Sequence, residues 1–174
     1  NHEYASKYFE QTLFYESKSS SFDRDQHVKI RMAHIESLLH MNSGDYHQQL
    51  KYALEALQYT RHLCQDTLIM LFLQIGTLYI LNEMYYDALL YFDKALKYHP
   101  QPDVLLRILT AKIRAFHFIG NFDKALEIAK QRTNMYLHHS EYTHVDMSSA
   151  CIDQARIYYA LGKYRKAMKS CQLA

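Results

Sequence analysis

A short segment recurs four times along the chain, and its recurrence limits the fold more than any other feature of the sequence. It reads GDYHQQL from Gly44, GNFDKAL from Gly120 and GKYRKAM from Gly162, and a copy without glycine, EMYYDAL, starts at Glu83. The four starts are separated by 39, 37 and 42 residues. A regular period of this length is typical of similar units that stack on one another. The sequence therefore predicts a repeat array.

Each unit is predicted to contain two helices. Glycine just after a helix end adopts the left-handed conformation without a steric penalty, so each glycine is expected to end a first helix. The second helix then presents a small residue, Ala88 or Ala125, where a larger side chain would cost about 1–3 kcal/mol. Ala88, Phe92 and Ala95 share a helical stripe that is expected to stop at Pro100. With four glycines and two prolines, the chain lacks the turns that sheets need, which predicts an all-α fold.

The stretch from Thr67 to Leu81 is apolar enough to raise the question of a membrane span. It has 15 residues and contains Gln74, whereas a membrane helix needs about 20 predominantly apolar residues. Helices that are apolar on all sides also occur in the cores of globular proteins. We therefore expect a buried core helix here.

Charge and cysteine content argue against several kinds of partner. The formal net charge is +2 with both signs interspersed, whereas nucleic-acid binding needs clustered cations. The same mixture argues against attraction to a membrane surface. Cys64, Cys151 and Cys171 form no CxxC pair, and an odd, irregular set fits reduced thiols. We expect a cytoplasmic protein that contacts neither nucleic acid nor membrane directly.

The segment from Ile69 to Pro102 resembles a tetratricopeptide repeat. The pattern of that family is W-x2-L-G-x2-Y, followed by A-x3-F and then P. The matching residues, in order, are Phe72, Ile75, Gly76, Tyr79, Ala88, Phe92 and Pro100. Weaker copies surround the other glycines, with Ala125 and Ala167 at the small position after Gly120 and Gly162. Periods of 37–42 residues exceed the family's 34, as in the longer repeats of bacterial regulators.

This resemblance implies a right-handed superhelical solenoid of antiparallel helix pairs. Residues 1–26 are interpreted as an N-terminal helix, the second helix of a preceding repeat, with Ala5, Phe9 and Leu13 on one face. The repeats that follow are assigned to residues 27–65, 66–102, 103–141 and 142–174, the last of them truncated. Both ends are expected to be cut from a longer array.

The resemblance also implies where a partner binds, because in this family the first helices of successive repeats line a concave groove. Carried over by position, the groove residues are Gln74, Thr77, Arg107, Thr110, Arg114, His117, Asp153, Arg156 and Tyr159. The same transfer adds Phe118, Ser149 and Ile152, and Arg31 and His34 from the first repeat.

Two interpretations of the groove arginines remain open. Arg114 and Arg156 occupy equivalent repeat positions, and arginine suits bidentate recognition of a carboxylate, which points to a peptide ligand. Alternatively, Arg156 pairs with Asp153 three positions earlier on the same helix and the others are solvated, since exposed ion pairs are common and contribute little.

No motif in the sequence indicates catalysis. The repeat explains all four glycines, and neither G-x-S-x-G nor H-E-x-x-H occurs. The histidines of His138–His144 are interpreted as a solvated connector and not as a metal site. We therefore expect no active site, metal or cofactor. The favoured function is a module that binds a protein or peptide, as a sensor or regulatory segment of a larger protein. The alternative is a scaffold that self-associates or packs against domains of its own chain.

Overall fold

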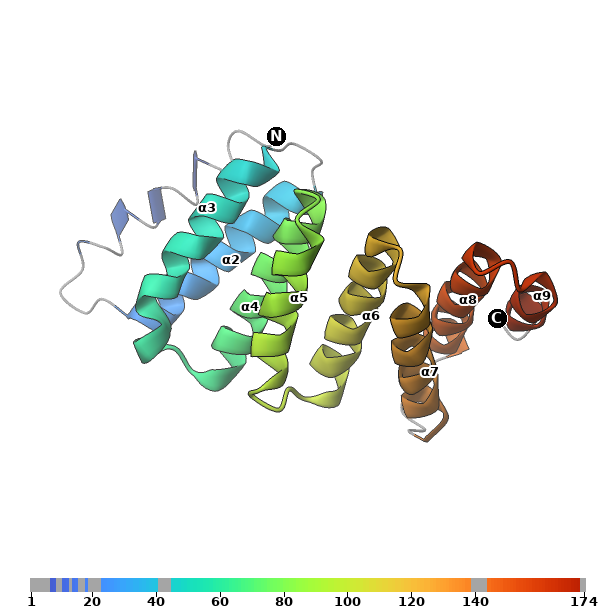
Figure 1. Ribbon diagram of the computed structural model, residues 1–174. Coiled ribbons are helices and arrows are strands. Elements are labelled where there is room, and N and C mark those ends of the chain that lie inside the picture. Colours follow the sequence, from blue (N-terminus) through green and yellow to red (C-terminus); the bar gives the residue numbers. More distant parts are fainter. Residues whose placement is uncertain are drawn as a thin grey trace. The chain divides into compact units, whose positions relative to one another are not determined.

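Every regular element in the described part of the chain is helical, which confirms the all-α prediction (Figure 1). The computed structural model describes residues 23–40, 45–138 and 144–172, with a few positions before residue 19. The chain divides into two compact units, Asn1–Pro100 and Gln101–Ala174. The first contains α2 (Arg24–His40), α3 (Tyr46–Ala56), the short 3-10 helix η1 (Leu57–His62), α4 (Gln65–Leu81) and α5 (Tyr85–Leu96). The second contains α6 (Pro102–Ile119), α7 (Phe122–His138), α8 (His144–Ala160) and α9 (Tyr164–Gln172).

Consecutive helices pack as antiparallel pairs within each unit, with α4 against α5, α6 against α7 and α8 against α9. This arrangement follows from the predicted alternation of first and second helices. The proposed repeat boundaries stay a prediction, and the N-terminal stripe of Ala5, Phe9 and Leu13 lies outside the described residues.

The apolar stretch around Thr67–Leu81 is a core helix. Ten residues of α4 are buried, and α4 contacts α2 and α3 as well as α5. Enclosure by neighbours on several sides accounts for apolar residues all round this helix. Among the described helices, none has both the length and the apolar character that crossing a membrane requires.

α4 and α5 approach one another closely at Gly76. A Cβ atom built there would lie 2.4 Å from Cε1 of Phe92, whose ring is fully buried. Ala88 and Ala95 are also fully buried on the same stripe of α5. Next to this contact, the ring of Tyr79 stacks on that of Tyr91 with centroids 5.3 Å apart. The absence of a side chain at Gly76 therefore lets α4 and α5 pack closely together.

Left-handed residues end the first helices of three pairs. Gly120 and Gly162 have φ of 82° and 69°. Glu83, the position that lacks glycine, has φ of 60°. In all three turns the next N–H donates back into the preceding helix, to the carbonyls of Phe116, Tyr158 and Tyr79. The backbone geometry of the turn is thus retained where the glycine is not. Gly44 lies outside the described residues.

The second helix of the α4–α5 pair ends earlier than expected. α5 stops at Leu96, four residues before Pro100, so the expectation that the helix runs to the proline is wrong. Proline disfavours the α conformation in the residue before it, and that residue, His99, has φ of 50°. Pro102 instead begins α6, where its missing N–H costs nothing.

The core of the second unit is built from small and branched residues of three helices. Ile113 of α6, Ala125 and Ala129 of α7, and Ile157 of α8 form one buried cluster. Ala167 of α9 is buried as well. The three cysteines are free thiols, and burial raises the pKa of the Cys151 thiol, an effect that the charge of Arg132 opposes.

Candidate functional site

A groove between α6 and α8 collects most of the predicted binding residues of the second unit. Its volume is about 620 Å³. The lining residues are Thr110, Ile113, Arg114, His117, Phe118, Ser149, Asp153, Arg156 and Ile157. We call this the α6–α8 groove. First helices of successive pairs therefore line a common surface within this unit, as their equivalent positions in the repeat require.

A buried arginine of α7 binds two polar side chains that line the α6–α8 groove, those of Thr110 and Asp153. Arg132 of α7 is only 1% exposed. One of its terminal nitrogens, Nη1, donates to Oγ1 of Thr110 at 2.6 Å, and Nη2 donates to Oδ2 of Asp153 at 2.7 Å. Nη2 also lies 3.4 Å from the carbonyl of Ser149. One side chain thus links α6, α7 and α8, and Asp153 is charge-paired at the groove wall.

The two groove arginines are available to a ligand. The contact between Nη1 of Arg156 and Oδ1 of Asp153 is long, at 3.9 Å, and the side chain of Arg156 is 73% exposed. An exposed pair of this kind contributes little. Arg114 is exposed and makes no ion pair within the described residues. The predicted contact between Arg156 and Asp153 is thus present but long, and Arg132 is the main partner of the aspartate.

The α6–α8 groove carries a net positive charge, because its arginines outnumber its unpaired carboxylates. Among its described lining residues, Asp153 is the one carboxylate, and Arg132 already neutralises it. The positive charges of Arg114 on α6 and Arg156 on α8 remain, one on each wall of the groove. Guanidinium groups offer several donors in a planar fork that fits a carboxylate. The arrangement therefore presents two guanidinium groups whose donors suit an anionic group.

Several predicted residues lie elsewhere in the structure. Arg107 is exposed on α6 but does not line the α6–α8 groove. Tyr159 packs edge-on against Tyr164 of α9, with ring centroids 5.4 Å apart, and lines a separate hollow. In the first unit, Gln74 donates through Nε2 to the carbonyl of Met32 at 2.9 Å. Thr77 donates to the carbonyl of Leu73 on its own helix at 2.9 Å.

Arg132 is the important residue that sequence reasoning missed. The signal was present, because Ala125, Ala129 and Arg132 are spaced i, i+4 and i+7 and so share one face of α7. A charged residue on a stripe of small buried residues indicates a buried pair. Its partner on another helix could not be read from the spacing.

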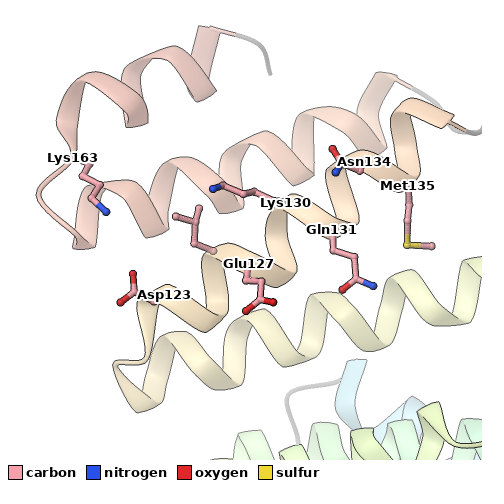
Figure 2. A pocket seen from close by; sticks show the side chains of 8 residues that line it. Asp123, Glu127, Lys130, Gln131, Asn134, Met135 and Lys163 are labelled. Carbon is pink, nitrogen blue, oxygen red and sulfur yellow. The ribbon is translucent and has the colours of Figure 1, made fainter.

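A second groove runs along the other side of α7 (Figure 2). Asp123, Glu127, Lys130 and the amides of Gln131 and Asn134 follow one another along this helix, and Lys163 approaches from the turn before α9 (Figure 2). The volume is about 820 Å³. Two carboxylates, of Asp123 and Glu127, and two ammonium groups, of Lys130 and Lys163, line this groove, so its charges balance. This surface therefore has no net preference for a charged ligand.

Several solved structures are similar to this chain, and they share its architecture. Neither the scan against protein-family models nor the search of curated proteins gives a match. Among solved structures, BtubC (BKLC) from P. vanneervenii is similar, with a TM-score of 0.83 and 15% identity over 98% of this chain and 70% of that one. A kinesin light chain protein of Podosopora anserina with nearly identical TPR-like repeats gives a TM-score of 0.80 and 13% identity, over 99% of this chain and 84% of that one.

A third similar structure is Bacillus thuringiensis PlcR, solved in complex with the peptide PapR7 and DNA. It has a TM-score of 0.71 and 10% identity, over 98% of this chain and 64% of that one. Sequence identities of 10–15% support a shared fold but no shared function or ligand. With its sequential antiparallel pairs and their internal period, the chain has a tetratricopeptide-like repeat fold.

Proposed function

We propose that the chain is a peptide-binding module whose α6–α8 groove recognises carboxylates. The observation that carries the proposal is the charge arrangement of this groove. Two exposed arginines from equivalent positions face it, while its aspartate is already bound by a buried arginine. Repeat folds of this kind serve as binding surfaces. No catalytic role is assigned to the groove.

The ligand is an acidic stretch of a partner protein or a peptide with a free carboxyl end. Ile113 and Ile157 provide apolar floor beside the arginines, and His117 and Phe118 close one side with rings 6.0 Å apart. Polar anchors beside an apolar floor give orientation as well as affinity. PlcR, with the peptide PapR7 in its complex, shows that a protein with a similar fold is compatible with a peptide ligand.

We further propose that the module acts as a sensor or regulatory segment of a larger protein. A module that acts by binding passes on a signal only through the ligand that it holds. This role depends on peptide binding in the α6–α8 groove and fails if the groove binds no peptide.

Selection from a displayed library of random peptides tests the function directly. The expected result is enrichment of Asp, Glu or a free carboxyl end by the wild-type chain, with loss of that enrichment in the Arg114→Gln/Arg156→Gln variant. Arg165→Gln is a matched control, because it removes an exposed arginine of α9 that does not line the groove. Enrichment that is neutral or basic, or that survives in the double variant, would reject the proposal.

The alternative, a scaffold that self-associates, has one observation in its favour. Tyr86, Leu90, Tyr164 and Met168 are large apolar side chains that are more than half exposed. Such side chains mark contact surfaces when they are contiguous. Light scattering over a concentration series distinguishes the two functions, since a peptide-binding module stays monomeric and a scaffold does not.

A further inference from the structure

The α6–α8 groove is lined by a histidine, a residue type whose charge changes near neutral pH. His117 of α6 lines the groove together with Arg114 and Arg156, and its side chain is half-buried. Histidine ordinarily titrates near pH 6.5, whereas carboxylates and guanidinium groups keep their charges between pH 5.5 and 8. Among the described residues that line the groove, His117 is therefore the one that can change the charge of the groove in this range.

The imidazole of His117 is packed at the wall of the groove. Its ring lies edge-on to that of Phe118 on the same helix, with centroids 6.0 Å apart, and to that of Phe122 on α7, with centroids 5.4 Å apart. His117 belongs to the last turn of α6, where the carbonyl end of a helix attracts positive charge. Positions 114 and 117 are three residues apart, so Arg114 and His117 lie on the same side of α6.

The helices around His117 contribute more positive than negative charge. His117 also lines the hollow between α8 and α9, so groups from both sides belong to its surroundings. The charged and titratable ones are Arg114 on α6, Arg132 on α7 through its pair with Asp153, Asp153, Arg156 and Tyr159 on α8, and Tyr164 and Cys171 on α9. Because Arg132 already neutralises Asp153, a proton on His117 would add a third positive charge to a groove that has two.

A carboxylate in the groove would interact with that third charge. A neutral imidazole has one N–H donor, whereas the imidazolium has two donors and a positive charge. One attraction between unit charges about 4 Å apart, even in a watery surrounding, changes an affinity about threefold to tenfold. Linkage is reciprocal, so a proton that tightens peptide binding is itself bound more tightly when the peptide is present.

We propose that His117 makes the α6–α8 groove proton-dependent, so that an acidic peptide binds more tightly at pH 5.5 than at pH 8. This inference rests on the proposed function, because it needs a carboxylate in the groove. Arg114 and Arg156 attract the peptide at both pH values, and His117 adds to their attraction only when it is protonated. The groove thus releases an acidic ligand more readily as the pH rises.

Isothermal titration calorimetry on the whole chain tests this coupling. The probe is the acidic peptide that is most enriched in the library selection, synthesised without histidine, so that its own carboxylates stay ionised at pH 5.5. Wild type should bind it about threefold to tenfold more tightly at pH 5.5 than at pH 8. Titrations at pH 6.5 in two buffers with different ionisation enthalpies should show uptake of a fraction of one proton per bound peptide.

Two substitutions at His117 separate its charge from its packing. His117→Gln carries no charge at either pH, and His117→Lys carries one at both. Both variants should lose the pH dependence and the proton uptake, and the lysine variant should bind the peptide more tightly than the glutamine variant. His47→Gln is a matched control, because it removes an exposed histidine of α3 that does not line the groove. It should keep the pH dependence of wild type.

The possible failures of this proposal and of the proposed function differ. Binding to wild type that does not tighten between pH 8 and pH 5.5 would overturn the role of His117, and so would a pH dependence that survives in His117→Gln. Either result leaves the proposed function standing, because the two arginines carry their charges at both pH values. Absence of acidic-peptide binding at both pH values would reject the proposed function and this inference together.

Discussion

Replacing Gly76 by alanine adds one carbon atom at a close contact between α4 and α5. The new Cβ would lie 2.4, 2.7 and 2.9 Å from Cε1, Cδ1 and Cζ of Phe92. Ordinary van der Waals contact begins near 3.4 Å, so the closest atom is about 1 Å too near. Phe92 is fully buried, and its ring therefore cannot move aside into solvent.

Two opposing effects set the size of the loss. Overpacking a well-filled core costs about 1–3 kcal/mol. Alanine in the interior of a helix is better than glycine by about 1 kcal/mol. Because the ring cannot retreat, we expect the steric cost to prevail, with a net loss of about 1–2 kcal/mol in the free energy of unfolding.

Chemical denaturation followed by circular dichroism measures this loss, and Phe92→Leu tests its cause. Leucine lacks the Cε1 and Cζ atoms, so in that background Gly76→Ala should be neutral or stabilising by up to about 1 kcal/mol. Gly162→Ala is the comparison, since φ there is 69° and no atom lies within 4 Å of its Cβ. Its cost comes from the backbone and should not depend on Phe92. An equal cost of Gly76→Ala in both backgrounds would refute the steric argument.

Three further predictions concern other parts of the structure. Glu83→Gly should raise the free energy of unfolding by about 1 kcal/mol, because φ of 60° is unfavourable for a residue with a Cβ; an unchanged denaturation midpoint would contradict this. Arg132→Met should cost about 3 kcal/mol by leaving Asp153 with only its long contact to Arg156, and adding Asp153→Leu should recover most of that loss; no recovery in the denaturation midpoint would contradict the pairing. Burial, and then the charge of Arg31, lowers the pKa of His27 below 6.5, so the unfolded state takes up the proton first and stability should fall as pH drops below about 6.5. His27→Gln should reduce that fall relative to wild type in matched denaturation curves, and an identical pH profile would contradict it.

The sequence was sufficient for the helix pairs and their turns, because these depend on local patterns. Gly120 and Gly162 end their helices in the left-handed conformation because glycine has no Cβ to obstruct it. The end of α5 at Leu96 was not foreseen, and the turn between it and Pro100 places His99 at φ of 50°. Local patterns thus predict where helices turn better than where they stop.

The sequence predicted which candidate residues lie close together better than it predicted their side-chain partners. Thr110, Arg114 and Asp153 line one groove because equivalent positions of successive first helices are neighbours. Tyr159 was assigned to that groove, but it lies in the last turn of α8 and turns toward α9. The role of Arg132 depends on partners from two other helices, which no spacing along the chain encodes.

Amide NMR spectra of the isotopically labelled chain, titrated with a peptide enriched in the library selection, test the central claim most directly. If the α6–α8 groove binds carboxylates, the largest shifts should fall at Thr110, Arg114, Ser149 and Asp153. They should disappear in the Arg114→Gln/Arg156→Gln variant. Shifts confined to the surface around Glu127 and Lys130 on the other side of α7, or shifts that persist in the double variant, would contradict the account.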